Sequence, residues 1–205
     1  MPMVNRIGAQ PVRAYGILGR QLKNSALYWA TVIAPPSGVI SGGCLNADAE
    51  GNAYIASGVS GGSGGTNLLA YMLKPDGTFG WMSEISLSQA ITAIDAGVTT
   101  NNEYFIVAND HNPLTSTPVP TLFKLDQGGN LVFQETYSKA AANVVPTSLW
   151  CSGATTNAVT ITGLAAGTPQ TGFMMGINPT TGAILYEQNV TVGTSVIGMY
   201  DSSCY

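Results

Sequence analysis

The sequence predicts an all-β fold, a β-propeller-like domain of about four four-stranded blades. Charged residues make up only 9% of the 205 residues, while 25 are glycine and 11 are proline. This composition disfavours helices and favours strands joined by tight turns. A hairpin-like pattern also recurs, because Leu125 and Ile177 follow Leu73 at steps of 52 residues. A repeat of this length indicates a fold built from similar units. The large aromatic residues keep nearly the same spacing: Trp29, Trp81, Phe133 and Tyr186.

The recurring hairpin is clearest in residues 69–86. Leu69, Tyr71 and Leu73 alternate with smaller residues, a Pro-Asp-Gly turn follows, and Phe79 and Trp81 continue the alternation. Alternation on both sides of a glycine-containing turn is typical of paired strands. The same pattern returns at residues 121–137 and 172–190, and Asp126 and Asn178 occupy the turn position of Asp76. We interpret these three polar residues as turn formers.

A second pair of short apolar runs, joined by an asparagine-containing turn, precedes each hairpin, at residues 41–58, 90–109 and 147–163. With four strands a to d in each unit, the chain reads cd, abcd, abcd, abcd, ab. Residues 12–33, which contain Trp29, are then a degenerate first copy, and residues 196–205 are a partial last copy. Pairing of these two ends would complete a fourth blade without a free edge, so we expect the last blade to be closed by both termini.

Residues 1–11 contain two prolines and no sustained periodicity, so we interpret them as an extended arm that precedes a propeller-like domain, residues 12–205. The first 47 residues hold four basic and no acidic residues, and the remainder holds three basic and eleven acidic residues. We expect Arg6 and Arg13 to contact a partner, so that the arm anchors the domain to another subunit. An acidic body without a basic stripe argues against nucleic-acid binding. No apolar run reaches the roughly 20 residues needed to span a bilayer, so no membrane insertion is expected.

Residues 48–58 and 70–81 resemble the bacterial β-propeller repeat with the pattern Asp-x-x-Gly-Asn-x-Tyr-x-x-Gly, a further strand, Leu-x-x-Asp-Gly and a tryptophan. Together with the segment Tyr-Gly-Ile-Leu-Gly near the N-terminus, the repeats resemble proteins of tailed phages, especially marine ones. The resemblance implies a virion component, present as a homo-oligomer or in multiple copies, whose partners are other virion proteins.

Few residues suggest chemistry. His111 is the single histidine, and we interpret it as an exposed loop residue within a candidate binding loop, Asn109, Asp110, His111 and Asn112. No catalytic residues, metal site or cofactor are predicted. Cys44, Cys151 and Cys204 lack the spacing of a zinc site and are interpreted as small buried hydrophobic residues in a reduced compartment. The acidic run at 46–51 lacks the distal carboxylate of a calcium loop and is interpreted as a hairpin turn.

These observations favour a non-enzymatic bacteriophage virion structural protein, a tail, fibre or accessory component attached through its N-terminal segment. The alternative is a receptor- or glycan-binding propeller module on a virion or cell surface, which would use the loops between strands b and c. A third hypothesis, an enzyme, has no set of residues to support it.

Overall fold

The computed structural model describes residues 3–7, 29–33, 39–62, 65–87, 91–111, 118–137, 144–151, 158–165 and 171–190. In these ranges every regular element is a β-strand, which confirms the all-β prediction. None of them contains a helix with the length and apolar character needed to cross a membrane.

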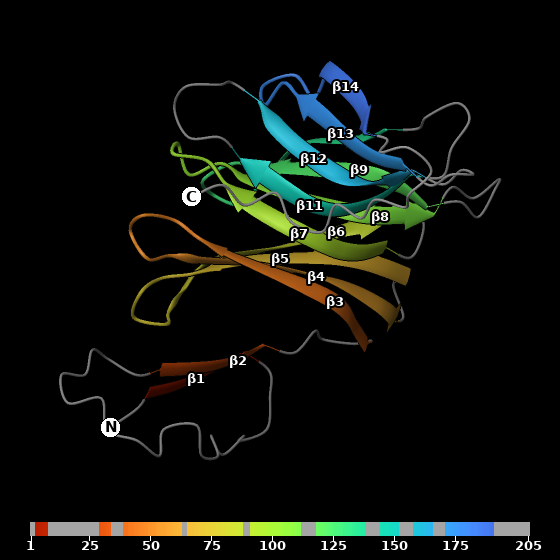
Figure 1. The fold of residues 1–205 in the computed structure, drawn as a ribbon. Helices are drawn as coiled ribbons and strands as arrows, with labels where there is room; N and C mark the ends of the chain where they lie inside the picture. Colours follow the sequence, from red (N-terminus) through yellow and green to blue (C-terminus); the bar gives the residue numbers. More distant parts are fainter. Residues whose placement is uncertain are drawn as a thin grey trace, which may run out of the picture.

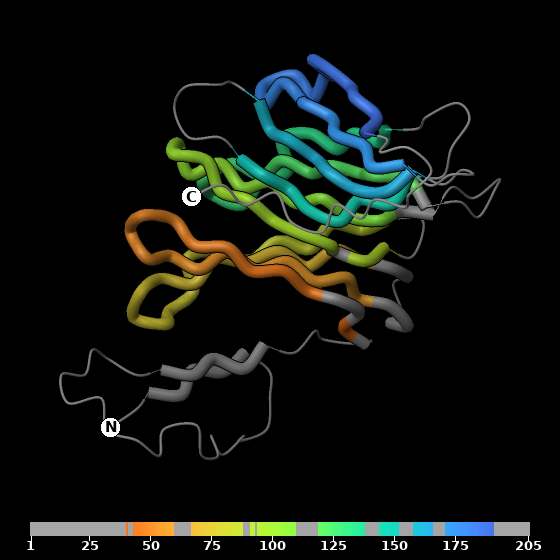
Figure 2. The backbone as a smooth tube through the Cα atoms, in the orientation of Figure 1, coloured from red at the N-terminus to blue at the C-terminus, as the bar shows by residue number. Residues whose placement is uncertain are grey.

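In the described part of the domain, the chain forms three antiparallel four-stranded sheets, here called blades 1, 2 and 3 (Figure 1). Figure 2 shows the chain completing one blade before it enters the next, from orange through green to blue. This order gives the propeller-like fold that the repeat predicts. Blade 1 consists of β3 (Val39–Ala47), β4 (Ala53–Gly62), β5 (Gly65–Leu73) and β6 (Phe79–Leu87). Blade 2 consists of β7 (Ile91–Val98), β8 (Tyr104–His111), β9 (Pro118–Leu125) and β10 (Leu131–Thr136). Blade 3 consists of β11 (Val144–Cys151), β12 (Val159–Ala165), β13 (Thr171–Ile177) and β14 (Ile184–Val190).

The position of a strand in this stack explains its sequence pattern. In β6, the outer strand of blade 1, residues alternate between partly buried and exposed along the whole strand. In β8 the run from Tyr104 to Ala108 is buried without interruption. Blade 2 lies between the other two blades, so both of its faces are covered, and a continuous apolar run is the pattern that a doubly covered strand requires.

The pairing register repeats with the sequence. Trp81 pairs with Met72, Phe133 pairs with Lys124, and Tyr186 pairs with Gly176, each between the third and fourth strands of a blade. A β-bulge lies close to each of these pairs, and a second bulge interrupts the pairing of the first two strands in every blade. The predicted equivalence is therefore confirmed for Trp81, Phe133 and Tyr186.

The turns between the third and fourth strands also share one design. The side-chain oxygens of Asp76, Asp126 and Asn178 accept hydrogen bonds from backbone N–H groups two residues ahead. The side chains of Thr78 and Asn130 also donate hydrogen bonds to Asp76 and Asp126, and together with the backbone bonds they lower the pKa values of both carboxyl groups. Each turn ends in a glycine with positive φ: Gly77 at 81°, Gly129 at 81° and Gly182 at 72°. The interpretation of the three polar residues as turn formers is confirmed.

Adjacent blades pack through two apolar cores. Between blades 1 and 2, the Trp81 ring lies 6.1 Å from both the Tyr54 and the Tyr104 rings, measured between centroids. Between blades 2 and 3, Phe105 and Phe133 pack with Ile161, Phe173 and Ile177. Both cores join the inner face of one sheet to the next sheet, so each blade depends on its neighbour for burial.

A ring on the outer strand of one blade covers the turn glycine of the next blade. A Cβ atom at Gly129 would lie 2.4 Å from the Trp81 ring, and one at Gly182 would lie 2.8 Å from Cγ of Glu135 and 3.4 Å from the Phe133 ring. The Ser83 hydroxyl also donates a hydrogen bond to the carbonyl oxygen of Gly129. We call this arrangement the ring-on-glycine contact. At Gly129 this contact requires glycine both for the positive φ and for the close approach of the Trp81 ring, whereas at Gly182 the positive φ is the main requirement.

A buried cation adds a polar link between blades 2 and 3. Nζ of Lys124 lies 2.7 Å from a carboxylate oxygen of Glu103 and donates a hydrogen bond of 2.7 Å to the carbonyl oxygen of Pro179 in blade 3. It also lies 5.5 Å from the centroid of the Phe105 ring. Lys124 is 5% exposed, so its charge is tolerated only because these partners replace water.

The N-terminal segment differs from the prediction. Strand β1 (Met3–Ile7) pairs in parallel with β2 (Trp29–Ile33), in a sheet separate from the three blades. Trp29 is therefore not equivalent to Trp81, and residues 3–7, predicted as an arm for another subunit, pair with their own chain. Pairing satisfies backbone groups that a lone extended segment leaves open. The repeat spacing places Ser25 where the complete copies have a positive-φ glycine, so the first copy lacks the residue that their hairpin turn needs.

Two other expectations concern the ends and a loop. Residues 196–205, expected to pair with residues 12–33 in a fourth blade, lie outside the described residues, so closure by the termini stays a prediction. The glycine-rich sequence of residues 58–66 is typical of a flexible loop, but most of it extends strands β4 and β5, which pair as far as Gly62 and Gly65.

Replacing Gly129 with alanine tests the ring-on-glycine contact. The new Cβ combines an unfavourable positive φ with overlap of the Trp81 ring, so we expect Gly129→Ala to lower the free energy of unfolding by about 2–4 kcal/mol. Urea unfolding followed by circular dichroism measures it.

Gly128→Ala is the matched control in the same turn. Its Cβ would meet only the side chains of Asn130 and Asp126, at 3.2 and 3.3 Å, and its φ is not in the positive region. We expect a change several-fold smaller than at Gly129. Equal losses for the two variants would contradict the special role of the Gly129 position.

Candidate functional site

The first strands of the three blades, β3, β7 and β11, enclose the candidate site. β7 contacts both β3 and β11. A pocket of about 310 Å³ lies among them, lined by residues of all three strands: Asn46, Asp95, Ala96, Gly97, Val98, Leu149, Trp150 and Cys151. The repeat register places Asn46, Gly97 and Trp150 at the same position of successive blades, because their partners Tyr54, Phe105 and Thr160 are equivalent. The pocket is thus a product of the repeat.

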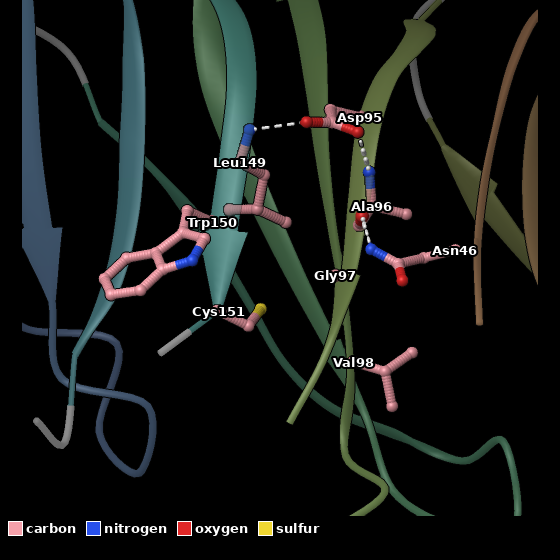
Figure 3. Close-up of a pocket in the computed structure, with 8 residues that line it drawn as sticks. All are labelled: Asn46, Asp95, Ala96, Gly97, Val98, Leu149, Trp150 and Cys151. Atoms are coloured by element: carbon pink, nitrogen blue, oxygen red, sulfur yellow. Dashed lines mark hydrogen bonds between the residues drawn. The ribbon is translucent and has the colours of Figure 1, made fainter. Parts of the chain in front are cut away.

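Asp95 is the charged residue in the lining of this pocket (Figure 3). Its Oδ2 atom accepts hydrogen bonds from the Leu149 backbone N–H at 2.7 Å and from the Ser148 hydroxyl at 3.0 Å. Its Oδ1 atom accepts one from the backbone N–H of Ala96 at 2.8 Å. Asp95 follows the β-bulge of β7, and bulges often re-aim a side chain. The carboxylate is therefore oriented by backbone and side chain donors from two blades.

Asn46 makes the corresponding link between blades 1 and 2. Its Nδ2 atom donates a hydrogen bond of 2.9 Å to the carbonyl oxygen of Ala96. Both backbone polar groups of Ala96 are therefore hydrogen-bonded to side chains. Its N–H group donates to Asp95, and its carbonyl oxygen accepts from Asn46. The side chains of Asn46 and Asp95 connect the three inner strands in series and fix the walls of the pocket.

Gly97 allows β7 and β11 to approach closely. A Cβ atom at this position would lie 2.4 Å from Sγ of Cys151. In Figure 3, Sγ of Cys151 points toward β7, whereas the indole ring of Trp150 extends from β11 to the opposite side. The thiol and the backbone of Gly97 therefore close one end of the pocket, and the carboxylate of Asp95 lies at the other.

The thiols near the pocket are protonated at neutral pH. Burial raises the pKa of Cys44 to about 12, and the negative charge of Asp95 adds to this shift. Burial also raises the pKa of Cys151 above its usual range, with smaller contributions from Asp95 and Glu103. Both residues are free cysteines and only partly exposed. A neutral, buried thiol is a weak nucleophile, so neither residue has the environment of a reactive cysteine.

None of the described candidate binding residues predicted from the sequence lines this pocket. Arg6 is in β1, paired with Val32, and Arg13 and Asn112 lie outside the described residues. Asn109, Asp110 and His111, predicted on a loop, are the last residues of β8 and pair with Pro120, Val119 and Pro118. Asn109 also pairs with Thr92 on β7, three positions before Asp95, so this end of the blade is separate from the pocket.

In the acidic run at residues 46–51, the first two residues end strand β3 and residues 48–51 form the predicted hairpin turn. Oδ1 of Asp48 accepts hydrogen bonds from the backbone N–H groups of Glu50 and Asn52, both at 2.9 Å. These contacts outweigh the effect of burial and lower the pKa of Asp48. Among the described residues, no three side chains of histidine, cysteine, aspartate or glutamate gather in a possible metal-binding group.

Asp95 is the functional residue that the sequence interpretation missed. The available signal was its position in the repeat, where register places it with Cys44 and Ser148. A carboxylate at a position held elsewhere by smaller, uncharged residues marks a departure from the pattern. Its importance depends on contacts with residues more than 50 positions away, which periodicity does not reveal.

Fold and site together define a propeller-like repeat protein with a pocket at its innermost strands. No family model and no curated protein match the sequence. Among solved structures, the chain is similar to a subtype N10 neuraminidase-like protein of A/little yellow-shouldered bat/Guatemala/060/2010, with 14% identity and a TM-score of 0.48, over 75% of this chain and 44% of that chain. It is also similar to an apocarotenoid oxygenase of Synechocystis, with 10% identity and a TM-score of 0.49, over 76% of this chain and 40% of that chain. The chain spans less than half the length of either protein.

This comparison contradicts one prediction. We expected a protein without enzymatic activity, but both neighbours bear the names of enzyme folds, a neuraminidase and an oxygenase. The expectation is therefore withdrawn. Likeness at this level concerns the fold alone, so the two names assign neither a reaction nor a substrate to this chain.

The raised thiol pKa values predict slow labelling of Cys44 and Cys151. At pH 8, a shift from 9.0 to about 12 leaves roughly 1000-fold less thiolate at Cys44 than in the unfolded chain. We expect Ellman's reagent to react with both thiols far more slowly in the native state than in 8 M urea, measured in a Cys204→Ser background.

The same shift predicts how stability depends on pH. The folded-state pKa of Cys44 lies above its unfolded value of 9.0. The stabilisation that the protonated thiol gives to the folded state is therefore complete below pH 9 and is lost as the pH rises toward 12. A Cys44→Ser variant should lose part of this alkaline dependence of the free energy of unfolding.

In the labelling experiment, a native-state rate within tenfold of the rate in urea would contradict the assignment of neutral thiols.

Proposed function

We propose that this chain is a structural component of a bacteriophage particle that docks to other virion proteins through the outer strands of its blades. The resemblance of its repeats and N-terminal segment to tailed-phage proteins motivates the proposal. The observation that carries it is a set of exposed apolar side chains on β10 and β14.

These side chains occupy matching places in two blades. Leu131 and Val132 begin β10 and are 44% and 50% exposed, and Ile184 and Leu185 begin β14 and are 48% and 52% exposed. Leu131 pairs with Leu125 and Ile184 pairs with Ile177, which are equivalent residues of the repeat. We call these four residues the outer apolar pairs.

Both strands are also edges of their sheets in the part of the chain that the structure describes, where β10 pairs with β9 and β14 pairs with β13. Exposed apolar residues on an edge strand favour association, because the edge offers unpaired backbone groups and the side chains lose water on contact. A recurrent apolar edge suits a protein that occurs in several copies within an assembly. Docking through these strands does not depend on a catalytic residue, and it is compatible with catalytic residues elsewhere in the chain.

Mass spectrometry of purified particles is the direct test. We expect the chain in particles from infected cells, and we expect the variant Val132→Ser/Leu185→Ser to enter them several-fold less than the wild-type chain. Substitutions at exposed positions change stability little, so the melting temperature should stay close to the wild-type value.

The control variant is Gln134→Ser/Gln188→Ser, which changes exposed polar residues on the same two strands. It should enter particles as the wild-type chain does. Absence of the wild-type chain from purified particles would overturn the proposal. Normal incorporation of the serine variant with loss of adsorption to host cells would support the receptor- or glycan-binding alternative instead.

A further inference from the structure

The pocket between β3, β7 and β11 contains a carboxylate that has acceptor capacity left. An ionised carboxylate offers about four lone-pair positions, and the side chain of Asp95 accepts three hydrogen bonds, from Ala96, Ser148 and Leu149. All three donors belong to the protein backbone or to a hydroxyl group. They orient the carboxylate without neutralising its charge.

Among the described residues, no basic side chain lines this pocket. Asp95 is the one charged residue among the eight that surround it, and the others are Asn46, Ala96, Gly97, Val98, Leu149, Trp150 and Cys151. In the part of the chain that the structure describes, the recorded salt bridge joins Lys124 to Glu103, away from Asp95. The negative charge of Asp95 also contributes to the raised pKa values of Cys44, Tyr104 and Cys151, so its field reaches the surrounding core.

The rest of the pocket suits the carbon chain of a small ligand. Val98 and Leu149 are the larger apolar residues of the lining, and Sγ of Cys151 lies against Gly97. The volume of about 310 Å³ is at the lower end of the range for small-molecule sites. The donor that Asn46 carries is already used on the Ala96 carbonyl oxygen. The unused polar group is therefore an acceptor with a negative charge.

We propose that this pocket binds a small organic cation, an alkylammonium or guanidinium compound, whose N–H group donates a charge-assisted hydrogen bond to the carboxylate of Asp95. The alkyl part of the ligand lies against Val98 and Leu149. The binding site is independent of the outer apolar pairs, so it can be tested without a phage particle.

Isothermal titration calorimetry of the full chain with n-butylammonium and with 1-butanol tests the charge requirement. The two probes have similar length but differ in charge, and a charge-assisted hydrogen bond predicts roughly 10- to 100-fold tighter binding of the ammonium. Amide NMR shifts of Ala96 and Leu149 should move on addition of n-butylammonium. Equal affinity for the two probes would overturn the proposal.

Asp95→Asn removes the charge and should lower the affinity for n-butylammonium by at least the same factor. Asp126→Asn is the matched control, since Asp126 lies on an exposed turn outside the pocket and should leave binding unchanged. If Asp95→Asn fails to fold, Val98→Phe keeps the charge, fills the pocket and should also abolish binding. Binding that survives Val98→Phe, or that falls as much in Asp126→Asn, would overturn the assignment.

Discussion

The ring-on-glycine contact is the interaction on which the rest of this structure depends. A side chain at Gly129 would meet Trp81, and one at Gly182 would meet Phe133 and Glu135, so each outer strand closes over the turn of the following blade. A four-stranded sheet alone leaves one apolar face in water, and burial of that face provides most of the stability of such a unit. The contact sets the spacing at which successive blades pack, and the two apolar cores form at that spacing.

The same packing produces the candidate site. When the outer strands are held together, the inner strands β3, β7 and β11 come close enough for Asn46 to reach the Ala96 carbonyl and for Asp95 to reach Leu149. Hydrogen bonds to a charged group are strong when water is partly excluded, so these contacts also stiffen the pocket. A change at a perimeter turn is therefore expected to reach the pocket through the blade as a rigid unit.

Two surfaces of the molecule differ in chemistry and suit different roles. The outer apolar pairs are exposed, uncharged and repeated, which suits a contact between proteins. The inner pocket is small, polar and occurs where three particular blades meet, which suits a small ligand with a positive charge. The two proposals are compatible because the two surfaces lie at opposite edges of a sheet. The outer apolar pairs are on the outer strands β10 and β14, and the pocket is lined by the inner strands β3, β7 and β11.

The sequence by itself determined the repeat, the strand order within each blade and the turns. Leu73, Leu125 and Ile177 stand at equal spacing, and Asp76, Asp126 and Asn178 fix local turns through contacts within a few residues, so periodicity and turn chemistry are sufficient. Trp29 shares that spacing yet lies in a parallel pair with β1, because spacing alone does not supply the turn glycine or the neighbouring sheet. Asp95 gained its role only in the tertiary structure, since its donors Ser148 and Leu149 come from the next blade and side chains brought together across blades leave no local pattern in the sequence.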